Sequence, residues 1–243
     1  MIPEKQIDEF VSKMRSAAGE NLTSIILYGS AATGEFHPDF SNVNLLCVFK
    51  ESSFAALASI ASVVKWWAGK KHHPPLVLTE EELNRSTDVF SIELLDMQQR
   101  HRVLFGNDLL IGLKISMRFH RAQLEYELRE KTVLLRQQIL RFSDRERDLW
   151  ELLLRSVSSF TTLFRHTLIA LGAEAPAVKR QAIEALSTRV QFDPSAFLQL
   201  LDIRERKAER KQFNVKDVCA RYLAAIQQIT SAVDTMLDSP KAE

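Results

Sequence analysis

Gly29 and Ser30 are the residues with the clearest chemical potential, because they follow a short apolar run and precede a segment that begins with small residues. A glycine lets the backbone come close to a ligand. A helix that starts just after it offers free N–H groups to an anion. The chemistry indicated is phosphate binding. The same pair is also compatible with an ordinary turn between a strand and a helix.

Two short segments must position this turn. Residues 22–28 and 43–49 are apolar and bounded by turn residues, a pattern that favours buried strands over helices. Asn42 and Asn44 lie at the start of the second segment. Because side chains alternate between the two faces of a strand, we expect both asparagines on one face.

The residues around this turn resemble the signature of the nucleotidyltransferase superfamily, which includes DNA polymerase beta and kanamycin nucleotidyltransferase. In that family a Gly-Ser turn is followed, about a dozen residues later, by two acidic residues separated by one. Here Ser41 follows Ser30 by eleven positions, but Asn42 and Asn44 occupy both acidic positions. The matching frame consists of Tyr28, Gly29, Ser30, Gly34, Ser41 and Leu45.

The resemblance implies a fold for nucleotidyl transfer without its usual metal ligands. The family uses two magnesium ions, which activate the nucleophile and neutralise the leaving pyrophosphate, and magnesium prefers anionic oxygen ligands. Asn42 and Asn44 keep the geometry of the acidic pair and lose both charges. We therefore expect a nucleotide- or phosphate-binding site at Gly29 and Ser30, former metal positions at Asn42 and Asn44, and no resident metal.

The family also supplies a third carboxylate from a later strand, where it can act as a base. Residues 89–97 are apolar enough to predict a third main strand, and they contain Glu93 and Asp96. By position Glu93 is the better candidate for a catalytic residue and Asp96 the second. Their odd spacing would place them on opposite faces of a strand, so only one could face the site. Either could equally be a solvated carboxylate.

Composition limits the class of protein. The chain has 243 residues and a formal net charge of +1, which gives no electrostatic argument for nucleic acid or a membrane surface. The N-terminus lacks the apolar core of a signal peptide, and no apolar run is long enough to span a bilayer. The two cysteines lie far apart, which favours two buried thiols in a reducing compartment. These features predict a cytoplasmic protein.

The second half of the chain has only helical patterns. We expect helices over residues 115–142, 143–171, 176–187, 194–211 and 215–237, joined by short connections as in an antiparallel bundle. Shorter strands are expected at 76–78 and 102–105, and capping residues predict helix starts at Thr79, Ser143 and Asn214. The predicted class is therefore α+β, with a nucleotidyltransferase-like mixed sheet flanked by helices in residues 1–112 and an all-α helical bundle in residues 113–243.

Three functions fit these patterns. The first is a catalytically degenerate nucleotidyltransferase-fold protein that binds ATP, another nucleotide or a protein partner in the inherited cleft. The second is an active transferase in which Glu93, Asp96 or Asp39 forms an unusual set of ligands for Mg²⁺. The third is an interaction module that forms a homo-oligomer, or binds another protein, through the bundle. The degenerate protein is the preferred hypothesis, because both metal carboxylates are replaced.

Overall fold

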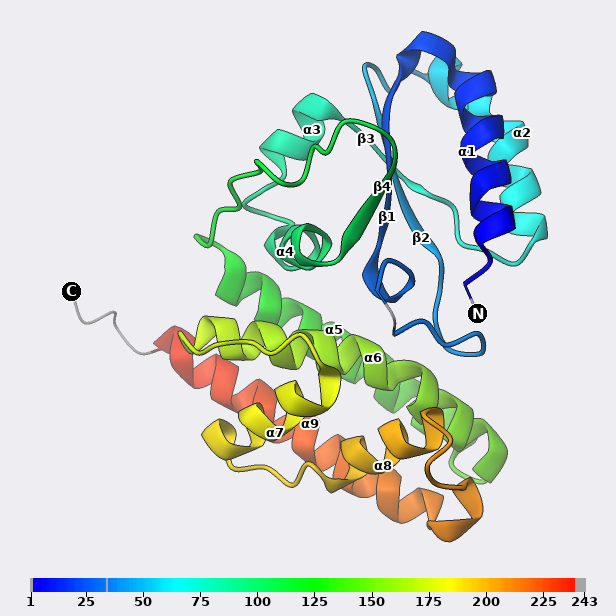
Figure 1. Ribbon diagram of the computed structural model, residues 1–243. Coiled ribbons are helices and arrows are strands. Elements are labelled where there is room, and N and C mark those ends of the chain that lie inside the picture. Colours follow the sequence, from blue (N-terminus) through cyan, green and yellow to red (C-terminus); the bar gives the residue numbers. More distant parts are fainter. Residues whose placement is uncertain (1, 34, 239–243) are drawn as a thin grey trace. The chain divides into compact units, whose positions relative to one another are not determined.

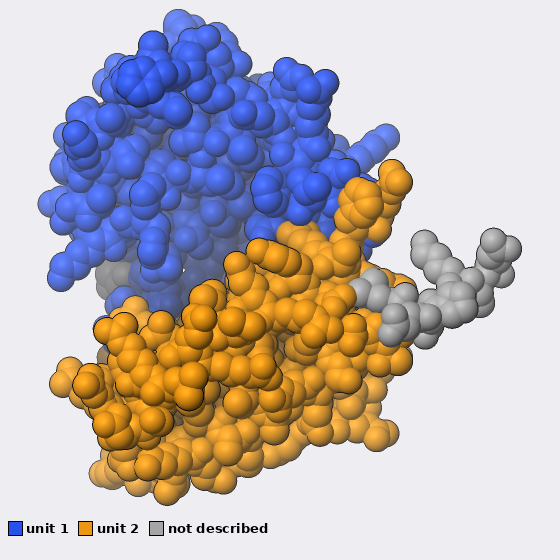
Figure 2. All heavy atoms as spheres, turned by 180° about the vertical axis from the view of Figure 1, so that it is seen from behind, with its two compact units in different colours: residues 1–117 blue, residues 118–243 orange. Residues whose placement is uncertain are grey.

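The computed structural model describes residues 2–33 and 35–238 and forms two compact units, residues 1–117 and 118–243 (Figure 2). Gly34, which belongs to the matching frame, lies outside the described residues. The first unit contains a sheet with helices on both faces (Figure 1), and the second contains only helices among its described residues. The α+β class predicted from the sequence is confirmed.

The first unit contains four helices and four strands among its described residues. Its sequential elements are α1 (Glu4–Ala18), β1 (Leu22–Tyr28), β2 (Asn44–Phe49), α2 (Phe54–Gly69), β3 (Leu76–Thr79), α3 (Glu80–Arg85), α4 (Ser91–Gln99) and β4 (His101–Gly106). Short 3₁₀ turns lie at Gly19–Asn21 and Gly29–Ala31. A capping box between Thr79 and Glu82 starts α3, as the sequence predicts.

The four strands are ordered β3-β2-β1-β4, so β1 is central. It pairs antiparallel with β2 and with β4, while β2 and β3 run parallel. One face of the sheet packs against α1 and α2 in a cluster that includes Ile25, Leu27 and Trp67. The other face packs against α3 and α4 through a smaller cluster that includes Ile26 and Met97. The sheet is thus covered on both faces (Figure 1).

The strand predicted over residues 89–97 is wrong, because this segment forms helix α4. A short apolar run does not by itself distinguish a buried strand from a buried helix. The helical spacing of Leu94 and Met97 lets both side chains pack on the same sheet face. Glu93 and Asp96 therefore lie one helical turn apart on α4, and the expectation that a strand would separate them is also wrong.

The second unit is a bundle of long helices with shorter ones between them. It contains α5 (His120–Phe142), α6 (Glu146–Ala170), α7 (Lys179–Val190), α8 (Ser195–Arg204), a 3₁₀ turn at Arg210–Gln212, and α9 (Val215–Asp238). Helix α6 is the centre of the bundle, with thirteen buried residues. Phe197 of α8 stacks on Tyr222 of α9, with ring centroids 4.3 Å apart.

Several predicted boundaries shift in the bundle. Helix α5 begins at His120 rather than at residue 115, and α8 ends at Arg204 before the predicted end of its helix. The capping box predicted at Ser143 does not form, because α6 begins at Glu146 without a side-chain cap. The predicted cap at Asn214 does form, since its side-chain oxygen accepts from the backbone N–H groups of Lys216 and Asp217.

Two further findings bear on the class of protein. No helix in the described part of the chain is both long and apolar enough to cross a bilayer. Cys47 and Cys219 are buried free thiols, as expected from their separation.

Candidate functional site

The chain reverses sharply where β1 ends at Gly29. This glycine has a φ of +75°, a conformation that side chains other than hydrogen disfavour. Its N–H donates to the Arg100 carbonyl at 3.0 Å, and its carbonyl accepts from the Ala32 N–H at 3.0 Å. Ser30 follows within the 3₁₀ turn and is partly exposed. The short helix expected after the Gly-Ser pair is thus a single 3₁₀ turn.

Asn44 lies directly against this turn. A Cβ atom added to Gly29 would lie 3.2 Å from the Asn44 Nδ2 atom. The absence of a side chain at Gly29 therefore lets the turn and the start of β2 come this close. Asn42 is exposed just before β2, and Val43 between the two asparagines is 2% exposed. We call Gly29, Ser30, Asn42 and Asn44 the turn site.

A row of polar side chains crosses three strands beside the turn site. In the sheet register Tyr28 is opposite Asn44 on β2 and opposite His101 on β4. Residues directly opposite each other in an antiparallel pair point to the same face. Tyr28, Asn44 and His101 therefore share the face covered by α4, and we call them the polar row. The sequence predicted the strands but gave no register, so it did not place His101 here.

His101 is held by a carboxylate. Its Nε2 atom lies 2.9 Å from the Asp108 Oδ2 atom, and the His101 side chain is 13% exposed. The second carboxylate oxygen, Oδ1, accepts from the backbone N–H groups of Leu110 and Ile111 at 3.0 and 3.2 Å. These bonds hold the pKa of Asp108 below its usual value despite the opposing effect of burial, which is the largest single influence. The Asp108 carboxylate therefore fixes the orientation of the His101 ring.

Glu93 of α4 acts on the polar row through Tyr28. Burial raises the pKa of the Tyr28 hydroxyl, and the negative charge of Glu93 raises it further. Tyr28 is therefore a neutral hydrogen-bond donor at physiological pH. Asp96, one turn further along α4, is partly buried. Glu93 is thus close enough to influence the site, although its predicted catalytic role stays a prediction.

An ion pair joins the segment after the turn to the end of α4. The Arg100 Nη1 atom lies 3.4 Å from the Glu35 Oε2 atom, and the Arg100 side chain is only 11% exposed. The carbonyl of the same residue accepts from Gly29. Arg100 therefore supports the turn with both its backbone and its side chain. The sequence carried no signal for this role, because Arg100 lies between the strands predicted over residues 89–97 and 102–105.

The donor set does not fit the two magnesium ions of the resembled family. Asn42 and Asn44 offer neutral amides where the family has carboxylates, and the Asn44 amide nitrogen lies against Gly29. Over residues 2–33 and 35–238, no three histidine, cysteine, aspartate or glutamate side chains come together as metal ligands. Neutral ligands leave little attraction for a small dication that dehydrates reluctantly.

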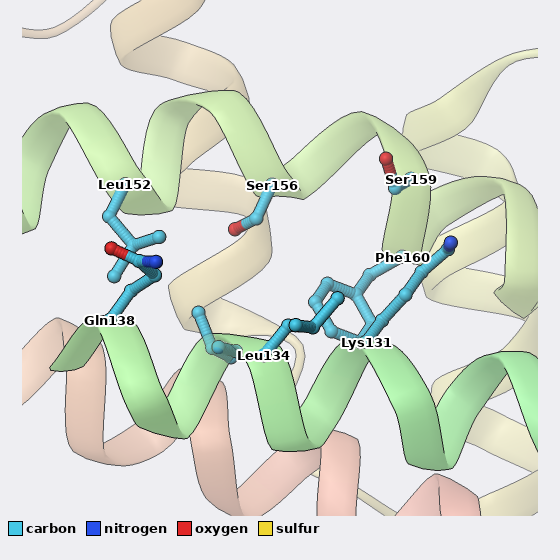
Figure 3. A pocket seen from close by; sticks show the side chains of 8 residues that line it. Lys131, Leu134, Gln138, Leu152, Ser156, Ser159 and Phe160 are labelled. Carbon is cyan, nitrogen blue, oxygen red and sulfur yellow. The ribbon is translucent and has the colours of Figure 1, made fainter. Parts of the chain in front are cut away.

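The bundle has hollows of its own. Side chains from α5 and α6 face each other across a groove of about 210 Å³ (Figure 3). Leu134 and Phe160 make it largely apolar, and the Ser156 hydroxyl lies 2.9 Å from the Tyr222 hydroxyl. A second hollow of about 330 Å³ lies between α5 and α9 and includes Arg136 and Gln227. Neither hollow contains the paired carboxylates that transfer chemistry requires.

Comparison with protein families gives a match over most of the chain. Residues 5–154 match the model of the nucleotidyltransferase domain. This segment includes the turn site, the polar row and the first helix of the bundle. No curated protein sequence matches the chain significantly.

Comparison with solved structures supports the same fold. Spectinomycin adenyltransferase AAD(9) from Enterococcus faecialis, solved with ATP and spectinomycin, superposes with a TM-score of 0.52 at 16% identity, over 97% of this chain and 99% of that chain. At this identity the similarity establishes the fold alone. A toxin–antitoxin structure with AMP-PNP covers 52% of this chain and 98% of its own, with 15% identity and a TM-score of 0.33, too low to establish a shared fold.

Proposed function

This chain belongs to the nucleotidyltransferase domain family, and we propose that it binds a nucleotide at the turn site without metal-dependent transfer. ATP is the first nucleotide to test, because the adenyltransferase of the same fold was solved with it. A protein partner that binds the same surface is a further form of this proposal.

One observation carries the proposal. The turn that would receive phosphate is intact, with Gly29 at a φ of +75°, while both positions that would hold the metal ions are asparagine. Two-metal catalysis needs anionic ligands to fix the ions that stabilise the attacking and leaving oxygens. Removing both charges leaves the binding surface and removes the catalytic ions.

The decisive experiment restores the charges. We expect the double variant Asn42→Asp, Asn44→Asp to gain Mg²⁺ binding in the presence of ATP, measured by isothermal titration calorimetry. At a hundred times the dissociation constant, a ligand stabilises the folded state by roughly 2.7 kcal/mol, a rise of several degrees in Tm for a protein of this size. The wild-type protein should show no such gain with Mg²⁺.

The control is Asn84→Asp, in which an exposed amide of α3 gains one negative charge away from the turn site, half of the charge added in the double variant. It should bind no Mg²⁺. If the double variant gains nothing either, the remaining surface has diverged from a metal-binding geometry. Nucleotidyl transfer by the wild-type protein with Mg²⁺ or Mn²⁺, abolished by Ser30→Ala, would overturn the proposal.

One feature favours active transfer as a second candidate. Glu93 and Asp96 lie one turn apart on α4, and Glu93 influences Tyr28 next to the turn site. In an active enzyme these carboxylates would have to replace the missing ligands. Their replacement by Gln and Asn would then abolish any transfer, whereas the binding proposal predicts no transfer to lose. An oligomeric interaction module would instead bind no nucleotide and show a concentration-dependent mass.

A further inference from the structure

We propose that His101, held by Asp108, binds the phosphate groups of a nucleotide directly, and that the site takes this nucleotide without a metal ion. This inference rests on the proposed function, because it names the group that replaces the metal at the same site. His101 lies on β4 and belongs neither to the pair of asparagines nor to the Gly-Ser turn.

The position of His101 is the first support. His101 is the direct cross-strand neighbour of Tyr28, and Gly29 follows Tyr28 at the end of the strand. The Gly29 N–H is bonded to Arg100, the residue before His101. The histidine therefore lies beside the turn, on the same sheet face as Asn44. Tyr28 and Asn44 can each donate a hydrogen bond to an anion, and His101 can do so through Nδ1–H when its ring is protonated.

The preparation of the imidazole is the second support. Asp108 fixes Nε2, and its other oxygen is fixed by two backbone N–H groups, as in sites where a carboxylate orients a functional histidine. The His101 Nδ1 atom makes no hydrogen bond to the residues that the structure describes. When the ring is protonated, Asp108 balances its charge and Nδ1–H can donate to a phosphate oxygen, a charge-assisted bond.

The loss of the carboxylates is the third support. In the family a dication lies between the acidic pair and the triphosphate, so the protein anions do not repel the ligand. With Asn42 and Asn44 this pair no longer repels the ligand, although the carboxylate of Glu93 still acts on Tyr28 in the polar row. Neutral and cationic donors can then contact the phosphates without an intervening ion. A purely structural role for the His101–Asp108 bond would be to hold residues 107–113 in place. The experiment therefore has to separate this structural role from phosphate binding.

The test uses the full chain and three probes: ATP, inorganic tripolyphosphate and adenosine, titrated calorimetrically in EDTA and again in MgCl₂. We expect ATP and tripolyphosphate to bind in EDTA, with no gain from Mg²⁺. His101→Gln should weaken both by about tenfold or more, the loss expected for one charge-assisted bond. The affinity of the His101→Gln variant for adenosine should not change. A purely structural role would move the Tm, or the affinity for all three probes, together.

Arg102→Gln is the matched control, because it removes a cation from the next position of the same strand. Arg102 is opposite Leu27 in the register and bonds to Glu4 of α1 at 2.8 Å, so it belongs to the other sheet face. This variant should leave the affinity for ATP unchanged. If it weakens ATP as much as His101→Gln does, general electrostatics explain the effect and the inference is overturned.

Asp108→Asn provides a second variant if His101→Gln fails to fold. The amide retains an oxygen for Leu110 and Ile111 and loses the charge that supports a protonated imidazole. We expect a smaller loss of ATP affinity than in His101→Gln, with unchanged adenosine binding. Unchanged ATP affinity in both variants would overturn the role of His101 and leave the proposed function standing. Wild-type protein that binds no ATP in either buffer would overturn both, and ATP binding only in MgCl₂ would overturn the metal-free mode.

Discussion

In the bundle, the buried threonines bond within their own helices, whereas the sheet unit brings polar side chains from separate strands together at the end of β1. Thr132, Thr161 and Thr167 are buried and donate to the carbonyls of Leu128, Val157 and Leu163, each one turn earlier in its helix, at 2.6, 2.6 and 2.9 Å. Such local bonds satisfy a buried hydroxyl at little cost. Burial of a polar group therefore does not by itself indicate a site in this unit.

The end of β1 is different, because its polar groups come from separate elements. Asn44, Tyr28 and His101 belong to three strands, and Asp108 follows β4. The Asp108 carboxylate holds the His101 ring at Nε2, and the Tyr28 hydroxyl and the Asn44 amide are hydrogen-bond donors on the same sheet face. The buried threonines of the bundle thus serve packing, whereas the proposed function gives the strand ends a role in binding. Substitutions in the two units should therefore have different effects on stability and on binding.

The largest effect is expected from Phe197→Ala in the bundle. Phe197 is fully buried, and its ring lies 4.7 Å from Phe164 and 4.3 Å from Tyr222. Truncation should destabilise the bundle by about 3–5 kcal/mol and lower its Tm by roughly 10 °C. Thermal unfolding followed by circular dichroism measures the change.

Phe54→Ala is the control for that change, since the same truncation is made at a side chain 88% exposed on α2. We expect a change within about 0.5 kcal/mol. Equal effects of the two substitutions would contradict the assignment of the bundle core.

The next effect depends on pH and on His120. Burial, with a smaller contribution from the charge of His166, lowers the pKa of this imidazole to about 4, and the two rings have centroids 5.1 Å apart. The unfolded chain takes up the proton near pH 6.5, whereas the folded bundle resists it until about pH 4. The stability that neutral His120 provides is therefore complete above pH 6.5 and is lost as the pH falls toward 4. We expect a decrease of about 5 °C in Tm between pH 7 and pH 5 from this group.

The variant His120→Gln should reduce this acid sensitivity relative to the wild-type protein. Differential scanning calorimetry across the pH range gives the comparison. An unchanged slope in His120→Gln would show that other groups control the acid response.

Local patterns explain which parts of the fold the sequence predicts. Strands β1 and β2 have short apolar runs bounded by turns, and α1 has Ile7, Phe10 and Met14 at helical spacing, all fully buried. The capping residues Thr79 and Asn214 mark two helix starts correctly. Each of these signals depends on residues within a few positions of one another, so the sequence alone is sufficient to predict these strands and helix starts.

The errors arise where tertiary contacts decide. Residues 89–97 are apolar in a way that suits a strand or a buried helix, and only packing against Leu46 and Val48 on the sheet selects α4. The candidate site shows the same limit. Gly29 and Asn44 are predicted neighbours through a motif, but His101 joins them only through the register of β4 against β1. Register depends on pairs distant in sequence, which no local pattern specifies.

The smallest effect, Gly29→Ala, tests how closely the turn site is built. The positive φ should cost about 1 kcal/mol on its own, and the new Cβ would lie 3.2 Å from the Asn44 Nδ2 atom. Gly19→Ala is a matched control, since Gly19 has a φ of +53° and no atom within 4 Å of the added Cβ. We expect Gly29→Ala to cost a few tenths of a kcal/mol more than Gly19→Ala in urea unfolding, on the order of a small steric contact. Adding Asn44→Ala should remove that excess, because the side chain that meets the Cβ is then gone. If the additional loss of stability persists, contact with Asn44 is not its cause. The Gly-Ser turn would then not be packed closely against the former metal position at Asn44.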